Sequence, residues 1–447
     1  MLIAALALLV LPAAYGSQSP WSKRSLSLTA HAKAQKDFMK LERSIAHLAT
    51  VKPVASTWYA GWHPTDFPPE HLPWKKYTTV KYAFAATTPN PADFKIAPAD
   101  DPIVKKVIRL GHSNNVAVHI SIGGWTGSQY FSTSVGNAAN RTAFIKAINN
   151  MVTHYGFDGV DFDWEYPNSQ GIGCNTVNSK DTANFLELLK ELRASSLPKK
   201  AVLSAATAIV PFLNLSGTPS SDVSQFAKYL DYIEVMNYDV WGSWSQTAGP
   251  NAPLNDSCVA KPDQAVGSAV SAVAAWTKAG IPARQIVLGV AAYGHSFAVK
   301  KADALGSGKT LLTSFPPFNA SAQPSGDKWD DAAGPDICGN DQPKGGIFNF
   351  WGLVDGGFLT KTGAVAPGIK YRFDSCSQTP SVYNTTSGVW VEFDDARSFR
   401  AKGKFIATHG LRGFAMWEAG GDYDDILLDA IRAGAGYDHV GGNCRGA

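Results

Sequence analysis

Apolar, β-branched and aromatic residues gather in short runs along this chain, and stretches with helical periodicity lie between the runs. Eight strand-like runs follow one another, at residues 56–62, 80–88, 116–125, 156–166, 201–210, 231–241, 285–297 and 410–420. Helix-like segments such as DTANFLELLKELRASS separate them. Strands that alternate with helices predict an α/β protein, and eight of them predict a (β/α)8, or TIM, barrel.

One gap in this alternation is long. More than a hundred residues separate the seventh run from the eighth, and the stretch 300–390 is rich in Gly, Pro, Asn and Asp with strand-like runs of its own. We therefore expect an α+β insertion domain at 300–390 between barrel strands seven and eight. The barrel itself is expected at 56–299 and 391–435, with a C-terminal tail at 436–447.

The N-terminus has the pattern of an export signal. A short apolar run is followed by the small residues Ala14 and Gly16, which predicts a signal peptide at 1–16, and the run is too short to span a bilayer. Residues 17–55 are polar and are expected to form a leader or surface helix. The mature protein is expected to be secreted and soluble. N-glycosylation sequons agree with this and begin at Asn140, Asn214, Asn255, Asn319 and Asn384.

The chain has five cysteines, an odd number. In an oxidising compartment they predict two disulfides and one free thiol. Cys174 and Cys258 follow the fourth and sixth strands, in loops on the same face of the barrel, whereas Cys338 and Cys376 both lie in the insertion. The expected pairs are therefore Cys174–Cys258 and Cys338–Cys376, with Cys444 free. No C-x-x-C pair or spaced histidine cluster occurs, so neither a metal nor another cofactor is predicted.

Composition narrows the class of protein. Hydrophobic residues make up 45% of the chain and charged residues 17%, with a net charge of +3. This is an ordinary globular balance, and without basic runs it argues against nucleic acid or a membrane as partner. We expect a monomer. The 13 Trp, 15 Tyr and 22 Phe are unusual, and they fit either a large core or a surface on which sugar rings stack.

The segment Gly156–Pro167 reads GFDGVDFDWEYP and holds four carboxylates in eight residues. Alternate residues of a strand share one face, so Asp161, Asp163 and Glu165 point the same way and Asp158 points the other way. In a barrel, the inward face near the C-terminal strand ends is the floor of the active site. Neighbouring carboxyl groups in that place cannot all ionise, so at least one pKa rises, which suits a general acid.

Two other interpretations of these acids are weaker. A calcium loop places Asp, Asn and Gly in a turn, whereas aromatic and β-branched residues separate the acids here. A solvated face would not need Phe162 and Trp164 on the opposite side of the strand. The pattern therefore favours catalysis.

The stretch DGVDFDWE resembles the D-x-x-D-x-D-x-E signature of family 18 glycoside hydrolases, the chitinases, which are substrate-assisted. The resemblance covers about residues 56–435 and is nearest to secreted fungal chitinases with an α+β insertion. It implies hydrolysis of β-1,4-N-acetylglucosamine linkages in chitin and chitooligosaccharides, with retained anomeric configuration. Further stretches resemble family motifs in chain order: YAFA at 82–85, SIGGW at 121–125, MNYD at 236–239 and GFAMWEAGGD at 413–422.

The resemblance implies the catalytic roles residue by residue. Glu165 would protonate the glycosidic oxygen. Asp163 would orient the substrate's acetamido group and stabilise the cyclised intermediate, and Asp161 would share a proton with Asp163. Tyr238 would donate a hydrogen bond to the acetamido oxygen.

The resemblance also implies the substrate-binding residues. Trp417 would form the floor under the distorted sugar, and Trp125 a stacking surface beyond the cleavage point. For both, and more strongly for Met236, packing of the barrel is the alternative. The further predicted substrate-binding residues are Met236, Asp239, Tyr293, Tyr59 and Phe84, of which Tyr59 and Phe84 suit core packing almost equally well.

The chain departs from the family pattern in one place. GVAAYGHSF resembles the stretch G-x-P-x-Y-G-R, but Ala291 stands for Pro and His295 for Arg. Contacts of an arginine on the non-reducing side of the cleft therefore cannot be carried over. Binding there is expected to be weaker or pH-dependent.

Three other functions compete with hydrolysis. A catalytically inactive chitin-binding lectin on the same fold would lose the acid, and Glu165 is present. An endoglycosidase that acts on N-glycans usually lacks the large insertion and the M-x-Y-D stretch. A structural secreted protein would leave the acids unexplained. Endo or exo action, processivity and biological role stay open.

Overall fold

The computed structural model describes residues 52–96, 100–306 and 310–437. The predicted signal peptide, the leader up to residue 51 and Cys444 lie outside these residues. Among the helices that the structure describes, none is both long and apolar enough to cross a membrane.

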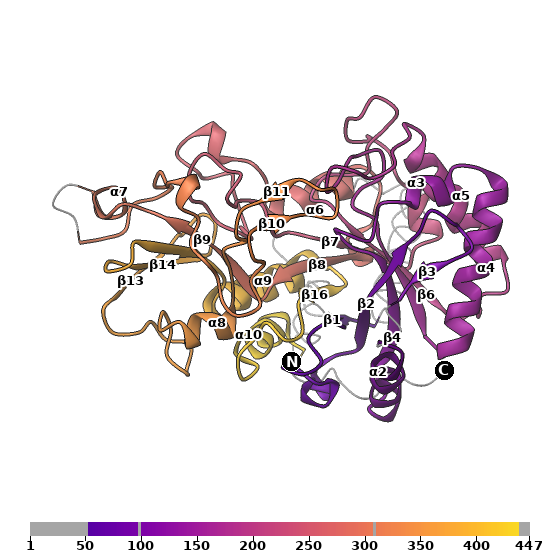
Figure 1. Cartoon of the computed structure of the whole chain (residues 1–447), viewed down its shortest axis with the longest axis horizontal. Coiled ribbons are helices and arrows are strands. Elements are labelled where there is room, and N and C mark those ends of the chain that lie inside the picture. The colour runs from indigo at the N-terminus through magenta and orange to yellow at the C-terminus, as the bar shows by residue number, and fades with distance from the viewer. Residues whose placement is uncertain (1–51, 97–99, 307–309, 438–447) are drawn as a thin grey trace, which may run out of the picture. The chain divides into compact units, whose positions relative to one another are not determined.

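Eight parallel strands form the closed barrel that the sequence predicts (Figure 1). The strand order is β1-β16-β8-β7-β6-β5-β4-β2, and pairing of β1 with β2 closes the ring. A short strand β3 (Phe94–Lys95) pairs with the end of β2 in antiparallel orientation. The barrel strands are β1 (Val54–Ala60), β2 (Thr79–Thr87), β4 (Ala117–Gly123), β5 (Gly159–Asp163), β6 (Val202–Thr207), β7 (Tyr232–Val235), β8 (Ile286–Ala291) and β16 (Gly413–Trp417).

Helices cover the outside of the barrel, so the strands are buried on both faces. Helix α4 begins at the N-cap Asn137, whose side chain accepts from the N–H of Asn140, and ends at Gly156 with a φ of 80°. The helices are α2 (Asp101–Ser113), α3 (Phe131–Val135), α4 (Ala138–Tyr155), α5 (Asp181–Ala194), α6 (Ala269–Lys278), α9 (Ala396–His409) and α10 (Ile426–Ala435). Single 3₁₀ turns are η1 (Pro69–His71), η2 (Trp74–Lys76), η4 (Phe226–Lys228), η5 (Pro262–Gln264), η6 (Ala283–Gln285) and η7 (Ala320–Ala322).

An insertion lies between β8 and β16, as predicted, and the structure shows that it is built on an antiparallel sheet. Its strand order is β12-β9-β15-β14-β13, and in Figure 1 this sheet lies to the left of the barrel. The strands are β9 (Tyr293–Ala298), β12 (Ile347–Asn349), β13 (Ile369–Phe373), β14 (Pro380–Asn384) and β15 (Val389–Glu392). The remaining elements are the hairpin of β10 (Gly334–Pro335) and β11 (Asp341–Gln342) with α7 (Lys301–Leu305) and α8 (Phe350–Asp355).

The run 285–297 is two strands rather than one. The chain leaves the barrel sheet at Ala292, whose N–H donates to the carbonyl of Trp417 and whose carbonyl accepts from Phe350. Beyond it, Tyr293 pairs with Asn349 of β12 in the second sheet. An unbroken apolar run records burial but not the partner strand, so the change of sheet is invisible in the sequence.

The predicted disulfide pairing is wrong. Cys174 is bonded to Cys338 and Cys258 to Cys376, each with a Cα–Cα distance of 5.6 Å. Each disulfide therefore joins a loop of the barrel to the insertion, instead of linking two cysteines of the same part. The prediction assumed that cysteines of one domain are neighbours, whereas the insertion folds back onto the loops after β5 and β7.

Candidate active site

The acids of β5 lie where the strand periodicity predicts. Asp161 and Asp163 are buried inside the barrel, with 0% and 3% of their surface exposed. Glu165 follows the end of β5 and is partly buried. Asp158 points outward, with Oδ2 2.9 Å from Nε2 of His112. The outward Trp164 stacks on Phe131 with ring centroids 5.0 Å apart.

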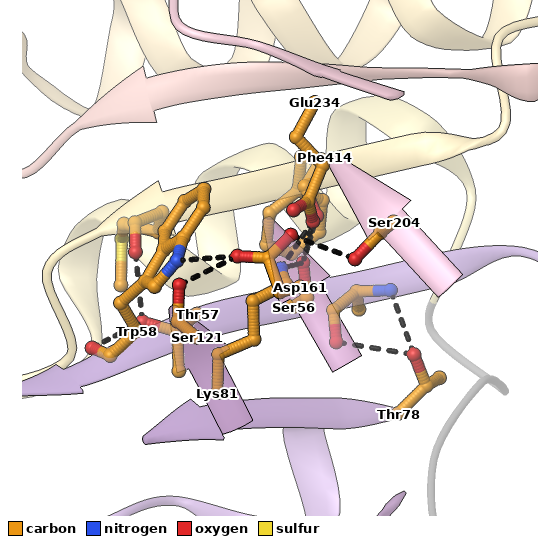
Figure 2. A network of polar contacts seen from close by, with 12 residues as sticks. Ser56, Thr57, Trp58, Thr78, Lys81, Ser121, Asp161, Ser204, Glu234 and Phe414 are labelled. Carbon is orange, nitrogen blue, oxygen red and sulfur yellow. Dashed lines mark hydrogen bonds and ion pairs between the residues drawn. The ribbon is translucent and has the colours of Figure 1, made fainter. Parts of the chain in front are cut away.

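Asp161 is held by donors on three strands. In register, Asp161 lies opposite Ser121 of β4 and Ser204 of β6. Ser121 Oγ donates to Oδ2 at 2.8 Å and Ser204 Oγ to Oδ1 at 2.7 Å. Trp58 Nε1 of β1 donates to Oδ2 at 3.1 Å (Figure 2). Both carboxyl oxygens of Asp161 therefore act as acceptors.

The other two acids hold their protons more strongly than usual. Burial raises the pKa of Asp163 well above its ordinary range, and Glu165 and Asp161 add to the rise. Burial, with a smaller contribution from Asp239, raises the pKa of Glu165 to about 8. Glu165 therefore keeps its proton at neutral pH, as a general acid must. Asp163 Oδ1 is buried without a partner among the described residues.

A polar cluster from the loop after β7 and from β9 lies near Glu165. The hydroxyl of Tyr293 donates to Asp239 Oδ1 at 2.7 Å, and His295 Nε2 lies 2.8 Å from the same oxygen. The partly buried ring of Tyr238 packs edge-on against Tyr293, with centroids 6.1 Å apart. His295 thus contacts the site through Asp239, and its effect on binding stays a prediction. Met236, 8% exposed, belongs to the apolar cluster that Tyr238 and Trp417 flank.

Aromatic side chains line the mouth of the barrel. Trp417 is partly buried and stacks on Phe84, with centroids 5.6 Å apart and ring planes at 15°. Trp125 is 50% exposed. Tyr59 is not brought to the acids, because it lies on the opposite face of β1 from Trp58, and its hydroxyl donates to the carbonyl of Phe67.

Sequence reasoning missed several residues of this region. Trp62 and Trp244 are 53% and 62% exposed, and the Trp62 ring lies 6.2 Å from that of Trp417. A Trp at or just after the end of a predicted barrel strand was the available sequence signal for both residues. Near Asp161, Lys81 of β2 and Glu234 of β7 are fully buried and contact one another directly. Each is the only charged residue inside its strand, which was a usable sign.

No cluster of three or more metal-binding side chains occurs in the part of the chain that the structure describes. What the site offers is one proton donor, a buried acid with a free oxygen, a phenol and an aromatic floor. Such a set can protonate a leaving oxygen while it holds a neighbouring polar group of the same ligand.

Comparison with known proteins shows which family and which solved structures the chain is similar to. The family model "Glycosyl hydrolases family 18" matches residues 56–422. A "chitinase-like effector" of Moniliophthora roreri is 52% identical over 386 residues, 86% of this chain and 93% of that protein. The crystal structure of a Rhizomucor miehei chitinase is 32% identical with a TM-score of 0.75, and covers 86% of this chain and 100% of that one. An Ostrinia furnacalis Group IV chitinase in complex with allosamidin is 25% identical with a TM-score of 0.69, covering 86% and 99%.

Proposed function

This chain belongs to family 18 of the glycosyl hydrolases, and we propose that it hydrolyses β-1,4-N-acetylglucosamine linkages in chitin and chitooligosaccharides. The observation that carries the proposal is Glu165. It stands at the end of the acid row with a pKa raised to about 8, so it keeps the proton that bond cleavage needs. The named chitinases among the similar structures support the substrate class.

The proposed reaction has two steps. In the first, Glu165 gives its proton to the glycosidic oxygen while the carbonyl oxygen of the substrate's own acetamido group attacks the anomeric carbon. The leaving sugar departs, and a cyclic oxazolinium-type intermediate remains. In the second, Glu165 takes a proton from water, which attacks the anomeric carbon and reopens the ring. Two inversions retain the configuration.

The remaining side chains act on the acetamido group and the sugar ring. Asp163, with its unpartnered Oδ1, accepts the acetamido N–H, and Tyr238 donates to the acetamido oxygen. Asp161, fixed by its donors, lies behind Asp163. Trp417 on its Phe84 support offers a flat face to the distorted sugar. Preorganised groups of this kind stabilise a transition state without reorganisation during the reaction.

A second candidate is oligosaccharide binding without hydrolysis. Its support is the relative at 52% identity, which is described as a chitinase-like effector rather than as a chitinase. The acid Glu165 favours hydrolysis, because binding alone needs no proton donor of raised pKa. For either function we propose that the protein acts outside the cell, since its two disulfides suit an oxidising compartment.

Time-resolved product analysis tests the proposal. Chitin hexamer and colloidal chitin are incubated with the wild type and with Glu165→Gln, and products are separated by chromatography. Hydrolysis is expected for the wild type alone. Binding of the hexamer by both proteins, with cleavage by neither, would favour the second candidate.

A further inference from the structure

A layer of charged groups, made of Lys81, Glu234 and Asp161, lies inside the barrel. Lys81 and Glu234 have no exposed side-chain surface and contact one another directly. Lys81 Nζ also donates to Ser56 Oγ at 3.1 Å and lies 4.2 Å from the ring centroid of Trp58. Buried charges are costly unless they are paired and hydrogen-bonded, so this layer calls for an explanation that ordinary packing does not supply.

Asp161 is the acid of this layer that is equipped to carry a negative charge. It accepts hydrogen bonds from Trp58, Ser121 and Ser204. The indole N–H of Trp58 can only donate, so the Asp161 oxygen that it contacts must be an acceptor. A buried carboxylate that accepts several hydrogen bonds is stabilised in its ionised form.

Glu234 has the opposite environment. Its Oε1 accepts hydrogen bonds from Lys81 Nζ and from the hydroxyl of Ser56, the latter at 3.1 Å. Its Oε2 is buried and has no partner among the described residues. Figure 2 shows the carboxyl groups of Glu234 and Asp161 side by side at the centre of the network. A proton on Oε2, donated to Asp161, satisfies the orphan oxygen. Burial raises the pKa of Glu234 to about 8, which Asp161 reinforces and Lys81 opposes.

Two other titratable neighbours of this layer, His119 and Tyr232, are neutral. Burial and the charge of Lys81 lower the pKa of His119, on β4, to about 3. Burial raises the pKa of Tyr232, on β7, well above its ordinary range. The charge of Arg412 opposes this rise, and its guanidinium carbon lies 5.1 Å from the centroid of the Tyr232 ring. The inward residues of β1, β6, β8 and β16 add no acid or base to the network in the described structure.

A count of charges then assigns the protons. One buried cation, Lys81, can balance one anion, and three acids share the space: Asp161, Asp163 and Glu234. Asp161 has the donors that an anion needs. Two protons are therefore left for Glu234 and Asp163, with Glu165 protonated at the mouth.

We propose that Glu234 and Lys81 are positioning residues of the reaction: Glu234 carries a proton that it donates to Asp161, and Lys81 balances the charge of Asp161. The row then keeps a single anion directly behind Asp163. That anion can accept the proton of Asp163 when Asp163 turns to the substrate. This inference rests on the proposed function, and it adds two residues from β2 and β7 to the acids of β5.

Three variants test the assignment through the pH profile of kcat/KM on chitin hexamer. Glu234→Gln keeps the shape of the side chain and a hydrogen-bond donor toward Asp161. The acidic limb of the profile, where kcat/KM falls at low pH, is therefore expected to stay at the wild-type pH. Glu234→Met removes the donor and Lys81→Met removes the cation, so both are expected to raise the limb by about one pH unit. An acidic limb that falls in Glu234→Gln would show an ionised Glu234 and would overturn the proposal. Because Glu234→Gln is isosteric, this arm is decisive even when Lys81→Met does not fold.

A second readout does not depend on activity. The pKa of Glu234 rises from 4.5 to about 8 on folding, so the folded wild type binds more protons than the unfolded chain in that window. The denaturation midpoint of the wild type, relative to Glu234→Gln, should therefore fall as pH rises from about 4.5 to 8. A difference that is flat with pH contradicts the proposal. If the wild type cuts no substrate, the proposed function fails while this measurement still judges Glu234.

Discussion

Ser128 holds the backbone of Glu165 in place. Its hydroxyl oxygen accepts from the N–H of Glu165 at 3.0 Å, and the same hydroxyl lies 2.9 Å from the carbonyl oxygen of Asp163 and 2.8 Å from that of Gly124. One side chain of the loop after β4 therefore fixes the turn that carries the proposed proton donor, on both sides of Trp164. Ser128 lies outside every motif that the sequence analysis selected.

Ser128→Ala is expected to lower kcat about tenfold with little change in KM, because a displaced acid loses alignment with the glycosidic oxygen. Steady-state kinetics on chitin hexamer measure both constants. Ser134→Ala is the matched control, since Ser134 is also a buried serine but its hydroxyl has no partner among the described residues. Equal kinetics of the two variants would contradict the role of Ser128.

Glu165→Gln is expected to abolish hydrolysis and to leave chitin hexamer binding intact, because glutamine keeps the shape but cannot supply the proton. Product chromatography and calorimetry measure the two properties. Asp158→Asn removes the outward acid of the same segment and should retain activity. Residual activity of Glu165→Gln within tenfold of the wild type would remove Glu165 from the acid role.

Hydrolysis is expected to fall as pH rises through about 8, the pKa of Glu165. Glu165 must be protonated to donate, and its raised pKa keeps it so at every lower pH. Since the charge of Asp239 contributes to this rise, Asp239→Asn should move the alkaline limb of the kcat/KM profile to lower pH. A limb near 4.5, the ordinary value of the carboxyl group, would contradict the assignment.

Substrate assistance predicts both the product and the substrates. Early NMR of chitin hexamer hydrolysis should show the β-anomer, because two inversions retain the configuration. Fully deacetylated chitosan and cellohexaose should not be cut, because they lack the acetamido nucleophile. A thiazoline mimic of the intermediate should inhibit. Initial release of the α-anomer, or turnover of cellohexaose comparable to that of chitin hexamer, would exclude the mechanism.

The disulfide between Cys174 and Cys338 is expected to stabilise the contact between barrel and insertion. Replacing both residues by serine should lower the free energy of unfolding by about 2–5 kcal/mol, as for other native disulfides. Denaturant titration measures the loss, and peptide mapping under non-reducing conditions should recover this pair and Cys258–Cys376. A peptide that links Cys174 to Cys258 would contradict the structure.

The sequence alone predicted the barrel and the orientation of its acids. Strand periodicity is set by backbone geometry, so Asp161 and Asp163 had to share a face, and Asp158 had to point away from it. The alternation of strands and helices likewise predicted the parallel sheet, because it needs no knowledge of distant contacts. The signature around Glu165 is equally local, which is why the family could be recognised before the fold.

Only the tertiary structure decided which distant groups meet. Lys81 and Glu234 are 153 positions apart, and Cys174 and Cys338 are 164 apart. Nothing local links the members of either pair. Closure of the barrel brings β2 and β7 across its interior from one another, and the packing of the insertion brings Cys338 to the loop after β5. Such contacts depend on strand register and on the path of the whole chain, whereas a sequence pattern records only which face of an element is buried.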